Sequence, residues 1–223
     1  MKYILLVTSL VLIWSCGEKK VIQLPEIDHS KINEITDVSA AYIFYDETKP
    51  DSTELNRKNL ISTTNWLVNV DKRLTLKQAI PQIILLQKKK RDAEFHKNEE
   101  AKNFYTCNDV SIKTLGFIEF TNTFYNQGTP ESIDLEDHKE AIALNFNDDG
   151  GISILNPKKQ PYIKETDTKN LLNDLKTLDT SNNLIYLNFH ENLTFQDYVS
   201  YKSLLLKTNL KFLKLSNQEF IYN

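Results

Sequence analysis

Histidine, cysteine and clustered acidic residues are the groups in this 223-residue chain that could carry catalysis or bind a metal. His96 and Glu100 stand four residues apart, but a zinc site needs three or four ligands. The Asn-Asp-Asp-Gly run at 147–150 has Asn156 where an EF-hand loop needs a glutamate. We therefore expect no metal and no cofactor, with a solvated helix at the first position and a hairpin turn at the second.

Catalytic motifs are absent from the sequence, which contains no nucleophile elbow, zinc-protease motif, Walker A loop or dinucleotide-binding glycine pattern. Asp137 and His138 precede an expected strand, and we interpret them as loop residues. We expect a non-enzymatic protein. The alternative is a hydrolase whose site is assembled from dispersed residues such as Asp71, His138 or His190.

Cys16 stands at the end of a short apolar run that begins after the positively charged Lys2. Residues 4–14 are apolar apart from Thr8 and Ser9, and these 11 positions are too few to cross a bilayer. Their length is typical of the hydrophobic region of a signal peptide. A secretory peptide with a chance cysteine, or a buried helix, is the alternative.

The Ile13-Trp14-Ser15-Cys16 sequence resembles the lipobox of bacterial lipoproteins, although Trp14 is bulkier than the residue usual there. The resemblance implies a signal peptide over residues 1–15, cleavage before Cys16, and acylation of its thiol with palmitate-type chains. Residues 16–36 would then be a lipidated tether. Diacyl and N-acyl chains together hold a protein firmly on a membrane. We expect a membrane-anchored envelope protein facing the periplasm, on the outer membrane rather than the inner.

The composition is that of a globular protein, with 40% hydrophobic and 26% charged residues. The length allows one ordinary core or two small lobes. A net charge of −3 argues against nucleic acid as a partner. If Cys16 is acylated, Cys107 has no partner within the chain, and we expect it to be a small buried hydrophobe.

The first half predicts regular structure from about Val38 onward. We expect strands at 40–45, 66–70 and 111–123, a turn at 49–52, and either strand or helix at 53–64. Thr75 and Gln78 form a capping box for a helix that Pro81 should kink or delay. The basic run 88–91 predicts a solvated extension of that helix, with a Lys90–Glu94 pair.

The second half predicts a hairpin over 141–155, a helix over 168–178, a strand over 184–189 and a last strand over 210–215. Thr194 caps the remaining helix. The order is β-β-α-β-α-β. Shifted by 119 residues, 66–88 lies over 185–207 without a gap, which suggests a duplicated strand-turn-helix unit.

This β-β-α-β-α-β pattern resembles the periplasmic domain of ExbD/TolR-type proteins. The residues that carry it are 141–146, the Asp149-Gly150-Gly151 turn, the helix over 168–178, the strand 184–189 and the helix from Thr194. That family has an Asp after its middle strand, which Asp71 matches in the first copy and His190 replaces in the second. The first copy is expected to lack part of the hairpin and the first helix. Because the chain has no proton-handling transmembrane helix, the resemblance implies a small partner-binding fold and no energy coupling.

Together these features predict an α+β protein with two small lobes. We expect a first lobe over 37–125, a linker over 126–136 and a second lobe over 137–223. The expected function is a binding or scaffold module in the periplasm, whose partner is an envelope protein or peptide, with a homodimer through strand edges as a further possibility. A lipoprotein inhibitor or immunity factor that binds a toxin is a second alternative.

Overall fold

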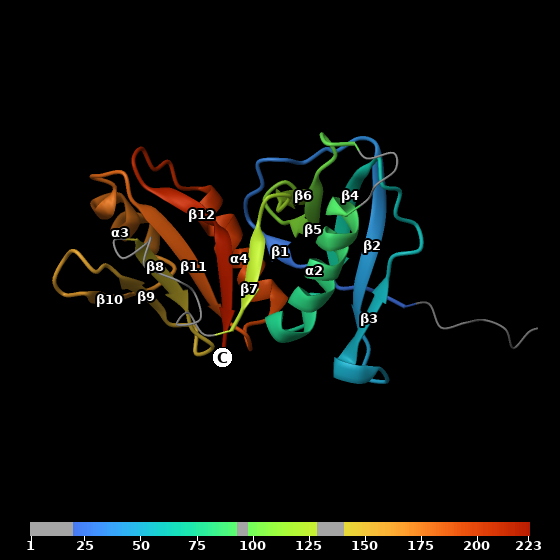
Figure 1. Cartoon of the computed structure of the whole chain (residues 1–223), viewed down its shortest axis with the longest axis horizontal. Helices are drawn as coiled ribbons and strands as arrows, with labels where there is room; N and C mark the ends of the chain where they lie inside the picture. Colours follow the sequence, from blue (N-terminus) through green and yellow to red (C-terminus); the bar gives the residue numbers. More distant parts are fainter. Residues whose placement is uncertain (1–19, 93–97, 129–140) are drawn as a thin grey trace, which may run out of the picture.

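The computed structural model describes residues 20–92, 98–128 and 141–223, and within them it is an α+β protein. Twelve strands form two mixed six-stranded sheets, and three α-helices accompany them (Figure 1). The predicted fold class is confirmed. None of the described helices combines the length and the apolar character that crossing a bilayer requires.

The first sheet has the order β1-β5-β4-β2-β3, with β6 on the other side of β5. Strands β1, β2, β4 and β5 run parallel, while β3 and β6 are antiparallel to their neighbours. The bounds are β1 Glu26–Ile27, β2 Val38–Tyr45, β3 Thr53–Asn56, β4 Asn65–Val70, β5 Asn103–Asp109 and β6 Thr114–Glu119. Helix α2, Leu76–Arg91, covers one face of this sheet (Figure 1), and a short 3-10 turn, Pro50–Ser52, links β2 to β3.

The second sheet has the order β10-β9-β8-β11-β12-β7. Here β8, β11, β12 and β7 run parallel. Strand β9 is antiparallel to β8, and β10 is antiparallel to β9. The strands are β7 Phe124–Gln127, β8 Ile142–Phe146, β9 Ile152–Leu155, β10 Ile163–Thr166, β11 Leu184–His190 and β12 Lys214–Tyr222. Helices α3, Leu171–Leu178, and α4, Phe195–Leu206, complete this half.

The two halves share one topology. The strand order β3-β2-β4-β5 of the first sheet matches β9-β8-β11-β12 of the second, with the same directions. Helices α2 and α4 begin 119 residues apart, at Leu76 and Phe195. The prediction of two similar strand-turn-helix units is therefore confirmed. The first half does contain the hairpin, β2–β3, which corrects the expectation that part of it is missing, whereas α3 has no counterpart between β3 and β4.

The halves meet through backbone hydrogen bonds that are related by the same offset. The N–H of Leu76 donates to the carbonyl of Leu193 at 2.9 Å, and the N–H of Phe195 donates to that of Leu74 at 2.7 Å. Leu74 corresponds to Leu193, and Leu76 to Phe195, under the 119-residue offset. This reciprocity is the pattern of a two-fold axis between the lobes, as in an isologous dimer interface.

A single hydrophobic core joins the two sheets. One cluster of buried side chains contains Val68 and Ile83 of the first half together with Leu187 and Val199 of the second. A buried polar chain crosses the same junction: Tyr105, Tyr125 and Tyr198 are joined through their hydroxyls, and Tyr198 donates to Glu219 at 2.8 Å. Lys202 pairs with the other Glu219 oxygen, so this carboxylate, 1% exposed, is compensated as a buried charge must be.

The N-terminal part of the described chain is folded against both halves, so the expectation that structure begins near Val38 is wrong. Strand β1 pairs with the end of β5, Pro25 and Ile27 are buried, and the carbonyl of His29 accepts a bond from Ser203 on α4 at 2.7 Å. Pro25, Ile27 and His29 all belong to the segment expected to be a tether. Isolated β-pairing of two residues carries no sequence pattern, which is why it was missed.

Several element boundaries also differ from expectation. Strand β5 was missed and β6 is only part of the strand expected over 111–123; β10 was missed, and the last strand begins at Lys214 rather than 210. Residues 126–127, expected to open a linker, form the end of β7 and pair with β12. The 53–64 segment contains β3. Helix α2 begins directly after Thr75, so Pro81 does not delay it.

Candidate functional site

The residues singled out for chemistry are not brought together. Cys16, His96 and His138 lie outside the described residues. Asp71 directly follows β4, and His190 is the last residue of the equivalent strand β11. Each accepts a hydrogen bond from the backbone N–H two residues later, at 3.1 and 3.2 Å. Both are turn residues at matching positions.

Asp71 has no free hydrogen-bonding capacity for a substrate. Its carboxylate is fully buried and receives two bonds from the Arg73 guanidinium at 2.8 Å, besides backbone bonds from Gln23 and Arg73. Burial by itself would raise the pKa of Asp71, but these donors outweigh it and the pKa lies below its usual value. The ionised Asp71 carboxylate therefore links the end of β4 to the N-terminal segment through hydrogen bonds.

The contacts of His190 likewise belong to the packing of the fold. Its Nδ1 lies 3.7 Å from the Asp148 carboxylate in the neighbouring hairpin, and its ring meets that of Tyr222 edge-on. The hairpin turn itself is closed by a bond from the Asn147 N–H to the Gly151 carbonyl at 2.9 Å, with Gly150 at a positive φ of 81°. The hairpin interpretation of this acidic run is confirmed. Nowhere in the described parts of the chain do three His, Cys, Asp or Glu residues gather to hold a metal.

The hollow beside β1 does not supply an activated nucleophile. It has a volume of about 350 Å³ and lies where β1 meets α4. Its two serine hydroxyls, on Ser200 and Ser203, donate to backbone carbonyls, and its Lys207 is paired with Asp28 at 2.7 Å. Cys107 is buried, as expected, and burial raises the pKa of its thiol.

Strand β10 is the part of the second sheet that offers backbone groups for pairing with another strand. It is the outermost strand, and among the described residues only β9 pairs with it. The Asn156 N–H donates to the Tyr162 carbonyl at 2.7 Å, so residues 162, 164 and 166 direct their backbone groups to β9. Ile163 and Glu165 direct theirs away from the sheet. This edge presents two backbone N–H and two carbonyl groups for pairing.

The two faces of β10 differ. On the inner face, Lys164 and Thr166 both bond to the Asp174 carboxylate of α3, at 2.5 and 2.7 Å, and these contacts hold the strand in place. The Lys164 bond is the largest cause of the lowered pKa of Asp174. On the outer face, Ile163 is 56% exposed beside Leu155, which is 36% exposed.

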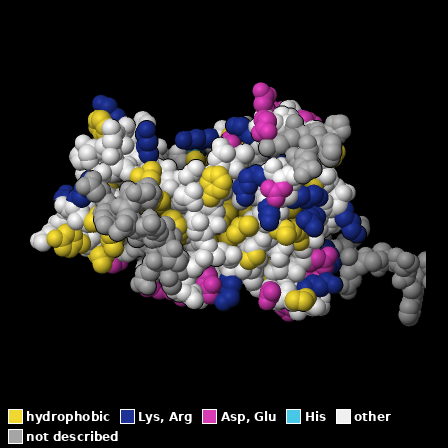
Figure 2. Space-filling model, in the orientation of Figure 1, with side chains coloured by type: hydrophobic (Ala, Val, Ile, Leu, Met, Phe, Trp, Pro, Cys, Tyr) yellow, Lys and Arg dark blue, Asp and Glu magenta, His cyan; other side chains and the backbone are white. Residues whose placement is uncertain are grey.

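The surroundings of this edge are apolar. Tyr162, next to the strand, is 54% exposed, and hydrophobic side chains gather at the end of the molecule where β9 and β10 lie (Figure 2). A hollow of about 110 Å³ opens on the inner side, between the loop before β10 and α3, with Pro161 and Leu178 in its wall. Sequence reasoning missed β10, because its four residues follow a Lys-Lys-Gln-Pro run typical of a loop.

Known proteins provide no comparison: no family model, curated protein or solved structure matches this chain.

Proposed function

We propose that this protein is a lipid-anchored cell-envelope module that binds an extended peptide segment of a partner protein at the β10 edge, without catalysing a reaction. The observation that carries the proposal is the open β10 edge with its exposed apolar neighbours. Acylation of Cys16 supplies the anchor and follows from the lipobox resemblance.

Pairing of a partner strand with β10 accounts for both the affinity and the specificity of the proposed recognition. Outward N–H and carbonyl groups of Ile163 and Glu165 give main-chain bonds to an added strand. Alternate side chains of that strand would lie beside Ile163 on the outer face and toward the 110 Å³ hollow on the inner face. The partner segment we expect is therefore extended, with apolar residues at alternate positions.

A second copy of this chain fits the edge poorly. An antiparallel β10 pair centred on Lys164 sets two ammonium groups opposite each other, and one centred on Glu165 sets two carboxylates opposite each other. A pair centred on Ile163 matches Glu165 with Pro161, which has no N–H to donate. A different polypeptide is thus the occupant that we propose, rather than a homodimer through this edge.

The test is to remove one outward donor without removing a β9–β10 bond. Glu165→Pro does this, because the Glu165 N–H points away from β9 and edge strands tolerate proline. Glu165→Ala is the matched control that keeps the N–H. A photo-crosslinking amino acid at position 163, introduced in intact cells, reports on the occupant.

We expect a crosslinked adduct of defined mass with the Glu165→Ala protein, and its loss together with loss of complementation of a deletion strain for Glu165→Pro. If the Glu165→Pro protein, at normal abundance, still forms the adduct and still complements the deletion strain, binding at the β10 edge is refuted. Complete loss of complementation by His190→Ala, with the adduct retained, would instead favour the dispersed-site hydrolase.

A further inference from the structure

The N-terminal segment is fastened to the first sheet close to Cys16. The ammonium of Lys20 binds the carboxylates of Asp46, at 2.7 Å, and Glu54. The backbone of Gln23 is held on both sides, by the Asp71 carboxylate at 3.3 Å and by the Lys72 N–H at 2.8 Å. From Lys20 onward the chain is therefore part of the folded protein.

This fastening limits how far the protein can stand from an acyl group on Cys16. Four residue steps separate Cys16 from Lys20, and even when fully extended they span only about 14 Å. A free tether over residues 16–36 would have reached about 70 Å when fully extended. The molecule must then lie almost in contact with the membrane that holds the acyl chains.

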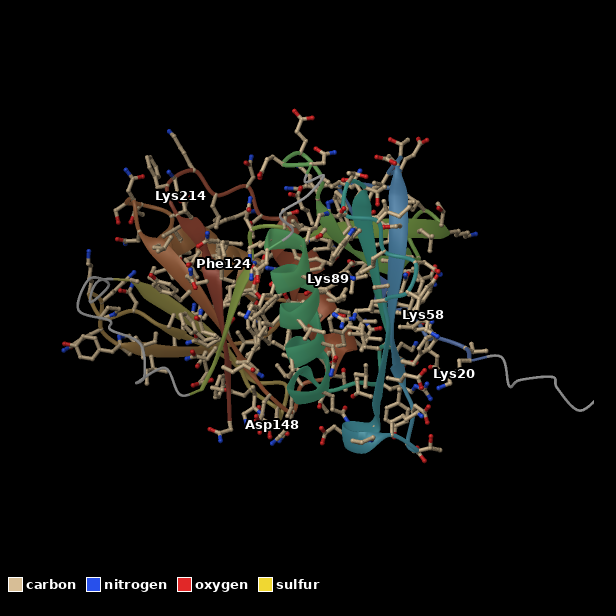
Figure 3. All side chains as sticks on the ribbon, turned by 45° about the vertical axis from the view of Figure 1, so that its right-hand side comes forward. Lys20, Lys58, Lys89, Phe124, Asp148 and Lys214 are labelled. Atoms are coloured by element: carbon tan, nitrogen blue, oxygen red, sulfur yellow. The ribbon has the colours of Figure 1, made fainter. Side chains whose placement is uncertain are left out.

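The position of Lys20 decides which surface is nearest. Lys20 lies beside β2 and β3, on the side of the first sheet away from α2 (Figure 3). Side chains on this outer face alternate with the buried Ile43, Val68 and Val70, which face α2. In β2, β3 and β4 the outer face includes Tyr42, Phe44, Glu54, Asn56, Leu67 and Asn69.

The chemistry of this face suits lipid headgroups. Tyr42 and Phe44 stack with ring centroids 5.8 Å apart and are half-buried, and Val21, next to Lys20, is 75% exposed. Aromatic rings are enriched at the membrane–water interface. Basic and acidic groups are both present here, because the exposed Arg57 and Lys58 follow β3, whose Glu54 is bound with Asp46 to Lys20, so charge alone does not attract the face to a membrane.

We propose that the outer face of the first sheet, around Tyr42, Phe44 and Lys58, lies against the lipid headgroups, and that the short link from Cys16 holds it there. The proposal rests on the acylation of Cys16 in the proposed function. Strand β10 lies at the opposite end of the molecule from β3 (Figure 1), so this orientation directs the β10 edge away from the bilayer.

The experiment uses the full-length acylated protein in vesicles of phosphatidylethanolamine and phosphatidylglycerol. An environment-sensitive fluorophore is attached at Lys58→Cys or, as the matched far-end control, at Glu165→Cys. Cys107 does not compete for the label because it is buried. Headgroup-linked nitroxide lipids quench a fluorophore only near the membrane surface. We expect several-fold stronger quenching at position 58 than at position 165.

A third protein carries a Gly/Ser insert of about 12 residues between Gly17 and Lys20, which adds an r.m.s. reach of about 20 Å. We expect this insert to bring the quenching at position 58 down toward that at position 165. Vesicle flotation separates the two proposals. A protein that floats but is quenched equally at both positions refutes the orientation while the anchor stands, as does quenching that the insert leaves unchanged. A protein that does not float, and incorporates no palmitate, refutes the acylation and this proposal with it.

Discussion

At the scale of single residues, Lys90 differs most from its sequence interpretation. It belongs to a run of four basic residues and was expected on a solvated face, but it is only 8% exposed. Its ammonium donates to the carbonyls of Thr64 and Lys102, at 3.2 and 2.9 Å, and lies 5.0 Å from the centroid of the Trp66 ring. The expected partner Glu94 lies outside the described residues. Burial lowers the pKa of Lys90 from 10.5 to about 8.

This lowered pKa predicts a stability change at alkaline pH. The folded protein releases the Lys90 proton near pH 8, whereas the unfolded chain keeps it to about 10.5, so the unfolded state binds more protons in between. The contribution of Lys90 to the free energy of unfolding therefore rises with pH across this window. Urea unfolding of wild type and Lys90→Met at several pH values measures it. A stability difference between the two proteins that stays constant from pH 7.5 to 10 would contradict the prediction.

At the scale of elements, the start of α4 is determined by a capping box. The Thr194 hydroxyl accepts from the Asp197 N–H at 3.1 Å, and the Asp197 carboxylate accepts from the Thr194 N–H at 3.0 Å. We expect Thr194→Ala to lower the free energy of unfolding by about 1 kcal/mol, because the Asp197 N–H loses its acceptor. Thr194→Ser, which keeps the hydroxyl, is the control and should lose less. Equal destabilisation by both substitutions, measured in urea, would show that the methyl contact and not the cap matters.

At the scale of the whole molecule, the shared core and the buried Tyr–Glu–Lys chain predict that the two halves unfold together. Glu219 lies in the second sheet, whereas Trp66, the one tryptophan after Cys16, lies in the first. We expect Glu219→Ala to cost about 3 kcal/mol, because Tyr198 and Lys202 lose a buried acceptor. The loss should appear equally in Trp66 fluorescence and in far-ultraviolet circular dichroism. A Trp66 transition that does not move while the dichroism transition does would mean that the halves are energetically independent.

Local patterns in the sequence determined much of this protein. The capping boxes at Thr75 and Thr194, the hairpin turn at 147–151 and the 119-residue offset all depend on residues close in sequence, so the strand-turn-helix units could be recognised. The α+β class followed from their order. The proposal that Cys16 is acylated rests on the first 16 residues alone and uses no feature of the fold.

What only the tertiary structure decided is where those units meet and what stays uncovered. Strand β5 is buried on both faces and shows no alternation to detect, while β1 and β10 are too short to carry a pattern. The burial of Lys90 depends on carbonyls contributed by distant loops, and the fastening of Lys20 depends on carboxylates 26 and 34 residues away. The open β10 edge is likewise a property of the sheet as a whole, because it depends on β9 being the one strand of the described chain that pairs with β10.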